Sequence, residues 1–119
     1  VLPPLRTQDD IDQLISGVKD GSIDTVTSDH NPLDMELKNV EFDKAEFGTI
    51  GLESIFGALN RIFPIKTTIN ILTKGKKVFG IEETQIKIGA QANLSLFNPI
   101  NSFVFNDDNV LSMSKNSIF

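Results

Sequence analysis

The chain contains no cysteine, and His30 is its only histidine. The missing thiols exclude disulfides, thiolate metal sites and a cysteine nucleophile. With one imidazole the chain cannot build a histidine-rich metal site, and a Ser-His-Asp catalytic site would have to use His30. Tryptophan and tyrosine are also absent. All nine aromatic residues are phenylalanine, which fits core positions better than a binding site.

Positive charge and long apolar runs are scarce too. The net charge of −5 and the pI of about 4.7 argue against nucleic-acid binding, which needs a basic face. No stretch approaches the roughly 20 apolar residues of a membrane span, and no secretion signal is recognisable. We therefore expect a cytoplasmic protein with no membrane or nucleic-acid partner. Its 119 residues suit one domain or part of a larger one. Because both ends look cut, we expect a piece of a larger protein.

A capped amphipathic helix is the clearest local pattern. In "TQDDIDQLISGVKDG" apolar residues recur at i, i+3, i+4 and i+7 from Ile11, which gives one apolar stripe on a helix. Thr7 is the expected N-cap, two aspartates follow in the first turn, and Gly21 can end the helix. A buried strand is predicted at 23–28. A helix followed closely by a strand is the repeating unit of an α/β fold.

The predicted strand ends at "SDHNP", where Asp29 and His30 precede a break at Asn31-Pro32. Chemistry in α/β proteins gathers at the carboxyl ends of strands, and an aspartate there can bind a metal or carry a proton. The alternative is that Asp29 only caps the turn. The charged, irregular stretch 31–47 is long for a compact domain and has the length of a functional loop.

Two more helices and then several strands are expected. Apolar spacing predicts a helix over 51–63 that Pro64 ends, and a shorter one capped by Thr67 or Thr68 and interrupted by Gly75.

Beyond residue 81 the period changes to two, which predicts strands near 86–88, 94–96 and 103–105. We therefore divide the chain into a helix-rich α/β part, 1–81, and a β-rich part, 82–119.

The order of these segments is more specific than any one of them. "LPPLR", "DDIDQLISGVKDGSID", "TSDHNP" and "FGTIGLESIF" together resemble the carboxy-terminal third of dihydroorotases, members of the amidohydrolase superfamily. "GIEETQIKIGAQANLSLFNP" is similar to the segment in which such enzymes leave their barrel and return to a small β-sandwich. The resemblance covers nearly the whole chain, in the family's order.

The resemblance implies a fold and a cofactor. The fold is α/β: residues 1–81 would be the carboxy-terminal part of a (β/α)8 TIM-like barrel, with its last strand, and 82–119 truncated return strands of the β-sandwich. Members of the family hold one or two metal ions, usually zinc. Their ligands are an early His-x-His pair, a lysine that is often carboxylated, two later histidines and an aspartate on the last barrel strand.

The resemblance also implies roles for individual residues. Asp29 matches the metal-binding aspartate, which takes a proton as the bridging hydroxide attacks the ring amide. His30 matches a histidine that often follows it, and we interpret it as structural or supporting rather than as a ligand. Phe47 and Gly48 fall where backbone groups contact dihydroorotate. Arg6 lies in the segment beside the substrate, although an exposed arginine without a role is the commoner case.

Three departures from the family pattern bear on activity. Leu2 replaces the asparagine that precedes "PPLR" and contacts substrate, and Leu33 replaces a histidine that helps to hold the substrate carboxylate. Leucine cannot donate a hydrogen bond to an anion, and an unpaired buried carboxylate is costly. Asn93 and Asn98 replace two aspartates of the sandwich segment, which affects structure more than chemistry.

These observations leave more than one function open. The leading hypothesis is a dihydroorotase that hydrolyses the cyclic amide of dihydroorotate to carbamoyl aspartate in pyrimidine biosynthesis; a hydantoinase or allantoinase is a neighbouring possibility. The alternative is a catalytically degenerate scaffold that binds a partner such as aspartate transcarbamoylase, or a homo-oligomer. Because a barrel needs about 250 residues, this chain would need the remainder of its barrel. We expect the isolated chain to bind no zinc tightly and to be inactive.

Overall fold

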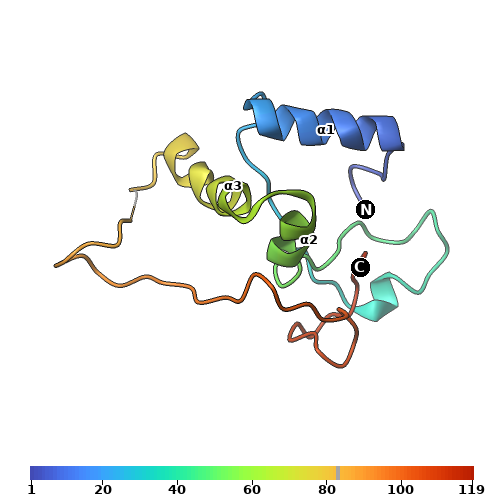
Figure 1. Cartoon of the computed structure of the whole chain (residues 1–119). Helices are drawn as coiled ribbons and strands as arrows, with labels where there is room; N and C mark the ends of the chain where they lie inside the picture. Colours follow the sequence, from blue (N-terminus) through green and yellow to red (C-terminus); the bar gives the residue numbers. More distant parts are fainter. Residues whose placement is uncertain (83) are drawn as a thin grey trace.

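A computed structural model describes residues 1–82 and 84–119, and its regular structure is helical (Figure 1). Helix α1 spans Gln8–Asp20, α2 spans Ile55–Ile62 and α3 spans Ile65–Val78, and a single 3-10 turn, η1, spans Met35–Leu37. In Figure 1 the two chain ends lie near each other, beside α2 and the loop that carries η1. None of these helices is long and apolar enough to cross a lipid bilayer.

Helix α1 forms as predicted because its ends are specified locally. The Thr7 amide donates to the Asp10 carboxylate at 3.1 Å, and the Asp10 amide donates to the Thr7 hydroxyl at 3.4 Å. This reciprocal capping box satisfies donors that the first turn leaves open. Gly21 ends the helix in the left-handed region, with φ of 86°, where glycine avoids a Cβ clash.

The bounds of α2 and α3 differ from the prediction. Helix α2 starts at Ile55 rather than at residue 51, because 52–54 form a turn before it. Neither threonine caps α3: Pro64 is its N-cap, and proline's fixed φ suits the start of a helix. Thr68 lies inside α3 and is completely buried, and its hydroxyl donates to the Phe63 carbonyl at 3.4 Å. The helix continues through Gly75.

A small hydrophobic core joins the three helices. Leu59 and Phe63 from α2 and its end pack with Ile71 from α3. The partly buried side chains that pack against these three come from α1, from the segment after it and from α2: Ile15, Val18, Val26 and Ile55. Val26 thus joins the segment after α1 to the helical core.

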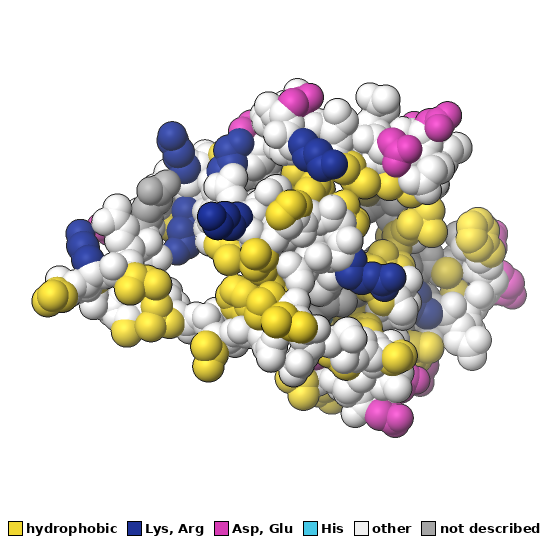
Figure 2. Space-filling view, in the orientation of Figure 1, with side chains coloured by type: hydrophobic (Ala, Val, Ile, Leu, Met, Phe, Trp, Pro, Cys, Tyr) yellow, Lys and Arg dark blue, Asp and Glu magenta, His cyan; other side chains and the backbone are white. Residues whose placement is uncertain are grey.

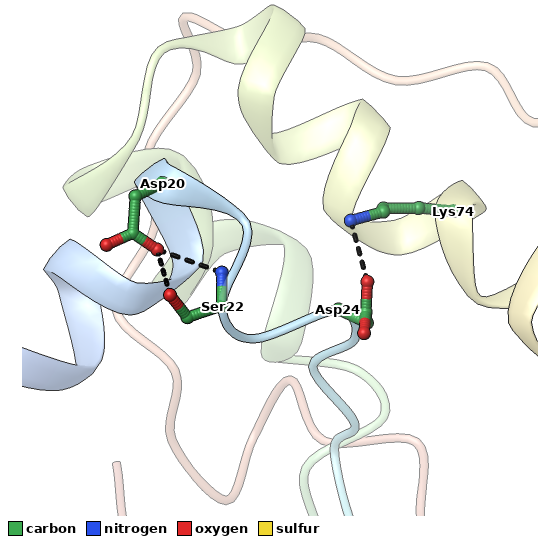
Figure 3. Close-up of polar contacts among 4 residues, drawn as sticks. All are labelled: Asp20, Ser22, Asp24 and Lys74. Carbon is green, nitrogen blue, oxygen red and sulfur yellow. Dashed lines mark hydrogen bonds and ion pairs between the residues drawn. The ribbon is translucent and has the colours of Figure 1, made fainter.

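One ion pair also links the segment after α1 to α3. The Lys74 ammonium lies 3.0 Å from the Asp24 carboxylate, while Asp20 at the end of α1 accepts hydrogen bonds from Ser22 (Figure 3). The Ser22 hydroxyl and amide lie 2.6 and 2.8 Å from the Asp20 carboxylate, and these bonds lower the pKa of Asp20. Both contacts are at the surface, so they orient the segment more than they stabilise it.

The predicted strands at 23–28, 86–88, 94–96 and 103–105 are not formed within the described part of the chain. Strand pairing there consists of two isolated parallel bridges, between His30 and Thr49 and between Ile50 and Ser117. A strand needs neighbours for its amides and carbonyls, and barrel or sandwich strands would have to come from elsewhere. The barrel and the sandwich stay predictions.

The chain exposes far more surface than a self-contained domain of its size. Its radius of gyration is 16.6 Å, whereas a compact chain of 119 residues has about 13.5 Å. Its accessible surface is 9836 Å², roughly 3,400 Å² more than the ~6,400 Å² of a compact protein of this mass. The segment after α3 runs away from the helices, and hydrophobic side chains lie open along it (Figures 1 and 2).

Candidate functional site

Asp29 lies in a strained turn at the end of the segment that follows α1. Its φ is 45°, in the left-handed region that few residues other than glycine adopt, although aspartate tolerates it. The Asp29 amide donates to the Thr27 hydroxyl at 3.3 Å. The Thr27 side chain therefore contacts the backbone at Asp29.

The Asp29 side chain lines a cavity of about 390 Å³. Three of the predicted site residues meet there, since Phe47 and Gly48 line the same cavity. The remaining lining residues come from both ends of the chain, from the position after His30 and from the position after Gly48: Val1, Leu2, Pro3, Leu5, Asn31, Thr49 and Ile118. Most of these residues are apolar, and Asp29 is the acidic residue among them.

Arg6 does not line this cavity. It lies in a neighbouring hollow with Pro3, Asp10, Gln13 and Leu14 on α1. Leu2 and Leu5, from the same amino-terminal segment, do line the cavity. Arg6 and Asp29, which were expected to share a substrate site, therefore line different cavities.

The loop that carries Phe47 and Gly48 is held by Asn31. The Asn31 amide donates to the Thr49 carbonyl at 2.9 Å, and its side-chain amide donates to the Phe47 carbonyl at 3.2 Å. Gly48 has φ of 154°, and a Cβ on it would lie 2.7 Å from the Asn31 side-chain nitrogen. Only glycine fits this close approach.

His30 holds the next part of the same loop. Its Nδ1 accepts the amide protons of Gly51 at 3.2 Å and Leu52 at 3.3 Å. In the neutral imidazole the proton is therefore on Nε2. A Cβ on Gly51 would lie 2.6 Å from the Ser28 carbonyl oxygen, so this glycine also permits a close backbone approach. In this structure His30 positions backbone groups and does not line the cavity.

Sequence reasoning missed the contribution of the carboxy-terminal residues. The Glu53 carboxylate accepts the amides of Leu111 at 2.8 Å and Ser112 at 2.9 Å. These backbone hydrogen bonds lower the pKa of Glu53. The Ser114 hydroxyl donates to the Leu33 carbonyl at 2.8 Å. The carboxy-terminal residues thus contact the turn before α2 and the segment that follows His30. No local pattern in the sequence indicates these contacts.

Asp29 is the metal ligand that the family resemblance implies for this chain. Within residues 1–82 and 84–119, no three histidine, aspartate or glutamate side chains lie close enough to hold an ion. A catalytic zinc site takes about three protein ligands, and Asp29 is one carboxylate in the cavity. The residues present fit one place in a coordination sphere, and further ligands would have to come from outside the chain.

Comparison with known proteins agrees with the family resemblance. No protein-family model matches the chain. Three dihydroorotases are similar to it over all or nearly all of its residues. That of Caldicellulosiruptor saccharolyticus is 38% identical over 126 residues, covering 100% of this chain and 29% of the relative. The dihydroorotase of a Thermoanaerobacter species is 37% identical, covering 98% of the chain and 28% of the relative. That of Endomicrobium trichonymphae is 35% identical, covering 98% and 30%.

The similarity defines the class first: the chain is homologous to enzymes, over its whole length. More particularly, it belongs to the dihydroorotase family. The chain spans less than a third of the length of the relatives it matches.

Proposed function

We propose that this chain is the carboxy-terminal part of a dihydroorotase, a cyclic amidohydrolase that converts dihydroorotate to carbamoyl aspartate in pyrimidine biosynthesis. The observation that carries the proposal is the cavity shared by Asp29, Phe47 and Gly48, in a chain similar to dihydroorotases throughout. Residues 1–81 would close the barrel and 82–119 would return to the β-sandwich. By itself the chain is expected to be inactive.

In this proposal Asp29 has two roles at one place. Its carboxylate would supply one ligand to a zinc site whose other ligands would come from outside this chain. It would also accept the proton of the attacking water and return it to the ring nitrogen as the C–N bond of the amide breaks. A bound zinc ion supplies an activated water at neutral pH. Asp29 shares the cavity with Phe47 and Gly48, whose backbone would lie against the ring.

The open surface of the chain supports a large protein partner. The roughly 3,400 Å² that the chain exposes beyond a compact fold is several times the ~800 Å² that each partner buries in a standard interface. Ile88 and Leu96, on two predicted sandwich strands, are fully exposed. We propose that the remainder of the dihydroorotase barrel and sandwich covers them, whether in one polypeptide or two.

A second candidate function follows from Leu2 and Leu33. Leu2 lines the cavity, the Leu33 side chain lies against Gly48, and Arg6 is outside the cavity. A substrate carboxylate would therefore meet apolar groups where a donor is needed. This favours a non-catalytic dihydroorotase-like scaffold that assembles as a homo-oligomer or with aspartate transcarbamoylase.

The experiment that separates the two is an assay of the complete protein with dihydroorotate, with zinc content measured in parallel. For a dihydroorotase, Asp29→Asn should lower kcat by at least about a hundredfold, while Asp34→Asn, at an exposed turn, should leave it unchanged. A protein that holds zinc but does not hydrolyse dihydroorotate would contradict the proposed enzymatic function. Co-elution with aspartate transcarbamoylase would then support the scaffold.

A further inference from the structure

Asn116 makes three hydrogen bonds to the loop that forms one wall of the cavity. Its carbonyl accepts the Ile50 amide proton at 2.8 Å and the Thr49 hydroxyl at 3.0 Å. Its side-chain amide donates to the Gly48 carbonyl. Three consecutive residues of the loop are thus bonded by one residue of the carboxy-terminal segment, which lies near the amino terminus in Figure 1.

The contact between the two segments is ordered and partly shielded from water. Ile50 forms a parallel bridge with Ser117 and is 1% exposed, and Asn116 itself is half-buried. The Gly48 carbonyl can only accept a hydrogen bond, so the nitrogen of the Asn116 side chain must face it. A polar group in such a place costs free energy when its partner is lost.

Residues 47–50 are hydrogen-bonded both by a residue that precedes them in the sequence and by one that follows them. Asn31 donates to Phe47 and Thr49 from the segment before the loop, and Asn116 contacts Gly48, Thr49 and Ile50 from the chain's far end. Because Gly48 has no side chain to anchor it and an unusual φ of 154°, its backbone depends on these outside partners. Ile118, two residues beyond Asn116, lines the same cavity.

We infer that Asn116 is a positioning residue for the cavity: its side chain fixes the Gly48 carbonyl, and so orients the Phe47–Gly48 backbone toward the bound ring. The hydrogen bonds are sufficient to infer that Asn116 positions the loop. The effect on substrate binding depends in addition on the proposed function. Asn116 does not touch substrate and is not a catalytic residue.

The test is Asn116→Asp in the complete protein, which keeps the size and the backbone bonds but replaces the donor by a charged acceptor. Hydrogen exchange of the 47–50 amides should become about tenfold faster, with α1 unchanged. KM for dihydroorotate should rise about tenfold with kcat within twofold, because the loop contributes binding alone. Asn101→Asp, the same change at an exposed residue, is the control and should alter neither.

Each outcome decides one question. Unchanged exchange at 47–50, or an equal increase in α1, overturns the positioning role, since the loss is then absent or global. Asn116→Ala, which removes the donor without adding charge, replaces the aspartate variant if that variant does not fold. Absence of turnover in the unmodified protein contradicts the proposed function, while the exchange measurement still decides the role of Asn116.

Discussion

The imidazole Nδ1 of His30 accepts the amide proton of Gly51 at 3.2 Å, and this bond fixes where the chain turns toward α2. Gly51 is buried, so its amide has little access to water as an alternative partner. The residue beside the candidate catalytic aspartate therefore controls the backbone of the opposite loop.

Replacing His30 separates its acceptor from its bulk. His30→Leu leaves the Gly51 and Leu52 amides without their acceptor and should lower the free energy of unfolding by about 1–3 kcal/mol. His30→Asn keeps an acceptor oxygen close to the position of Nδ1 and should cost less than about 1 kcal/mol. Urea denaturation of the complete protein measures both, and equal losses would rule out this role for Nδ1.

Gly48 and Gly57 form a matched pair of glycine-to-alanine substitutions. A Cβ at Gly48 would lie 2.9 Å from the Asn31 carbonyl oxygen and 2.9 Å from a Leu33 methyl group, at a φ that alanine disfavours. Gly48→Ala should therefore destabilise by about 2 kcal/mol or more. Gly57 lies within α2, with nothing within 4 Å of a Cβ.

Gly57→Ala should instead stabilise by about 0.5–1 kcal/mol, because alanine loses less backbone entropy in a helix. Thermal or urea unfolding compares the two variants. A Gly48→Ala protein as stable as the Gly57→Ala protein would show that the close approach at Gly48 is absent in solution.

Acid should release the carboxy-terminal residues from Glu53. The pKa of Glu53 in the folded chain is lowered by the Leu111 and Ser112 amides from its ordinary value of 4.5. Its contribution is therefore complete above pH 4.5 and is lost as the pH falls through the lowered value. Proteolysis of segment 106–113 between pH 7 and pH 3 measures the release.

Glu53→Gln removes the titrating carboxylate, so the rate of proteolysis of segment 106–113 should change less between pH 7 and pH 3. Glu36→Gln, at an exposed position on η1, is the control and should leave it unchanged. A Glu53→Gln protein with the same acid dependence as the unmodified protein would assign the release to another group.

Packing should outweigh the ion pair on α3. Ile71 is 7% exposed in the small core, and Ile71→Ala should cost about 2–5 kcal/mol. Asp24→Asn breaks the 3.0 Å contact with Lys74, in which the side chains of Lys74 and Asp24 are 36% and 61% exposed, and should cost less than about 1 kcal/mol. Denaturation in low and high salt separates them, because only the ion pair is screened; comparable losses would contradict this ranking.

Local sequence features predict α1 well and the other helices less well. The capping box and Gly21 lie next to the residues they terminate, so short-range rules are sufficient. Thr68 resembles a cap but lies inside α3 because burial against α2 decides its place. The predicted strands are not formed in residues 1–82 and 84–119, because a strand needs a paired neighbour and alternation of apolar residues does not identify that neighbour.

The candidate site divides in the same way. Asp29, Phe47 and Gly48 were predicted because the motifs that carry them occur in the order of the dihydroorotase family, and the three residues line one cavity. Arg6 belongs to such a motif but faces a different hollow. Asn116 belonged to none of the motifs, and its partner Gly48 lies 68 residues away, a separation at which single-sequence periodicity carries no information.

That separation also orders events during synthesis. Helix α1 is bounded by contacts within a few residues and can form as soon as it leaves the ribosome, whereas Gly48 waits for Asn116 before its carbonyl has its partner. Chain growth at about 5–20 residues per second then imposes a delay of several seconds between the two. The cavity consequently cannot be complete before Asn116 has been synthesised.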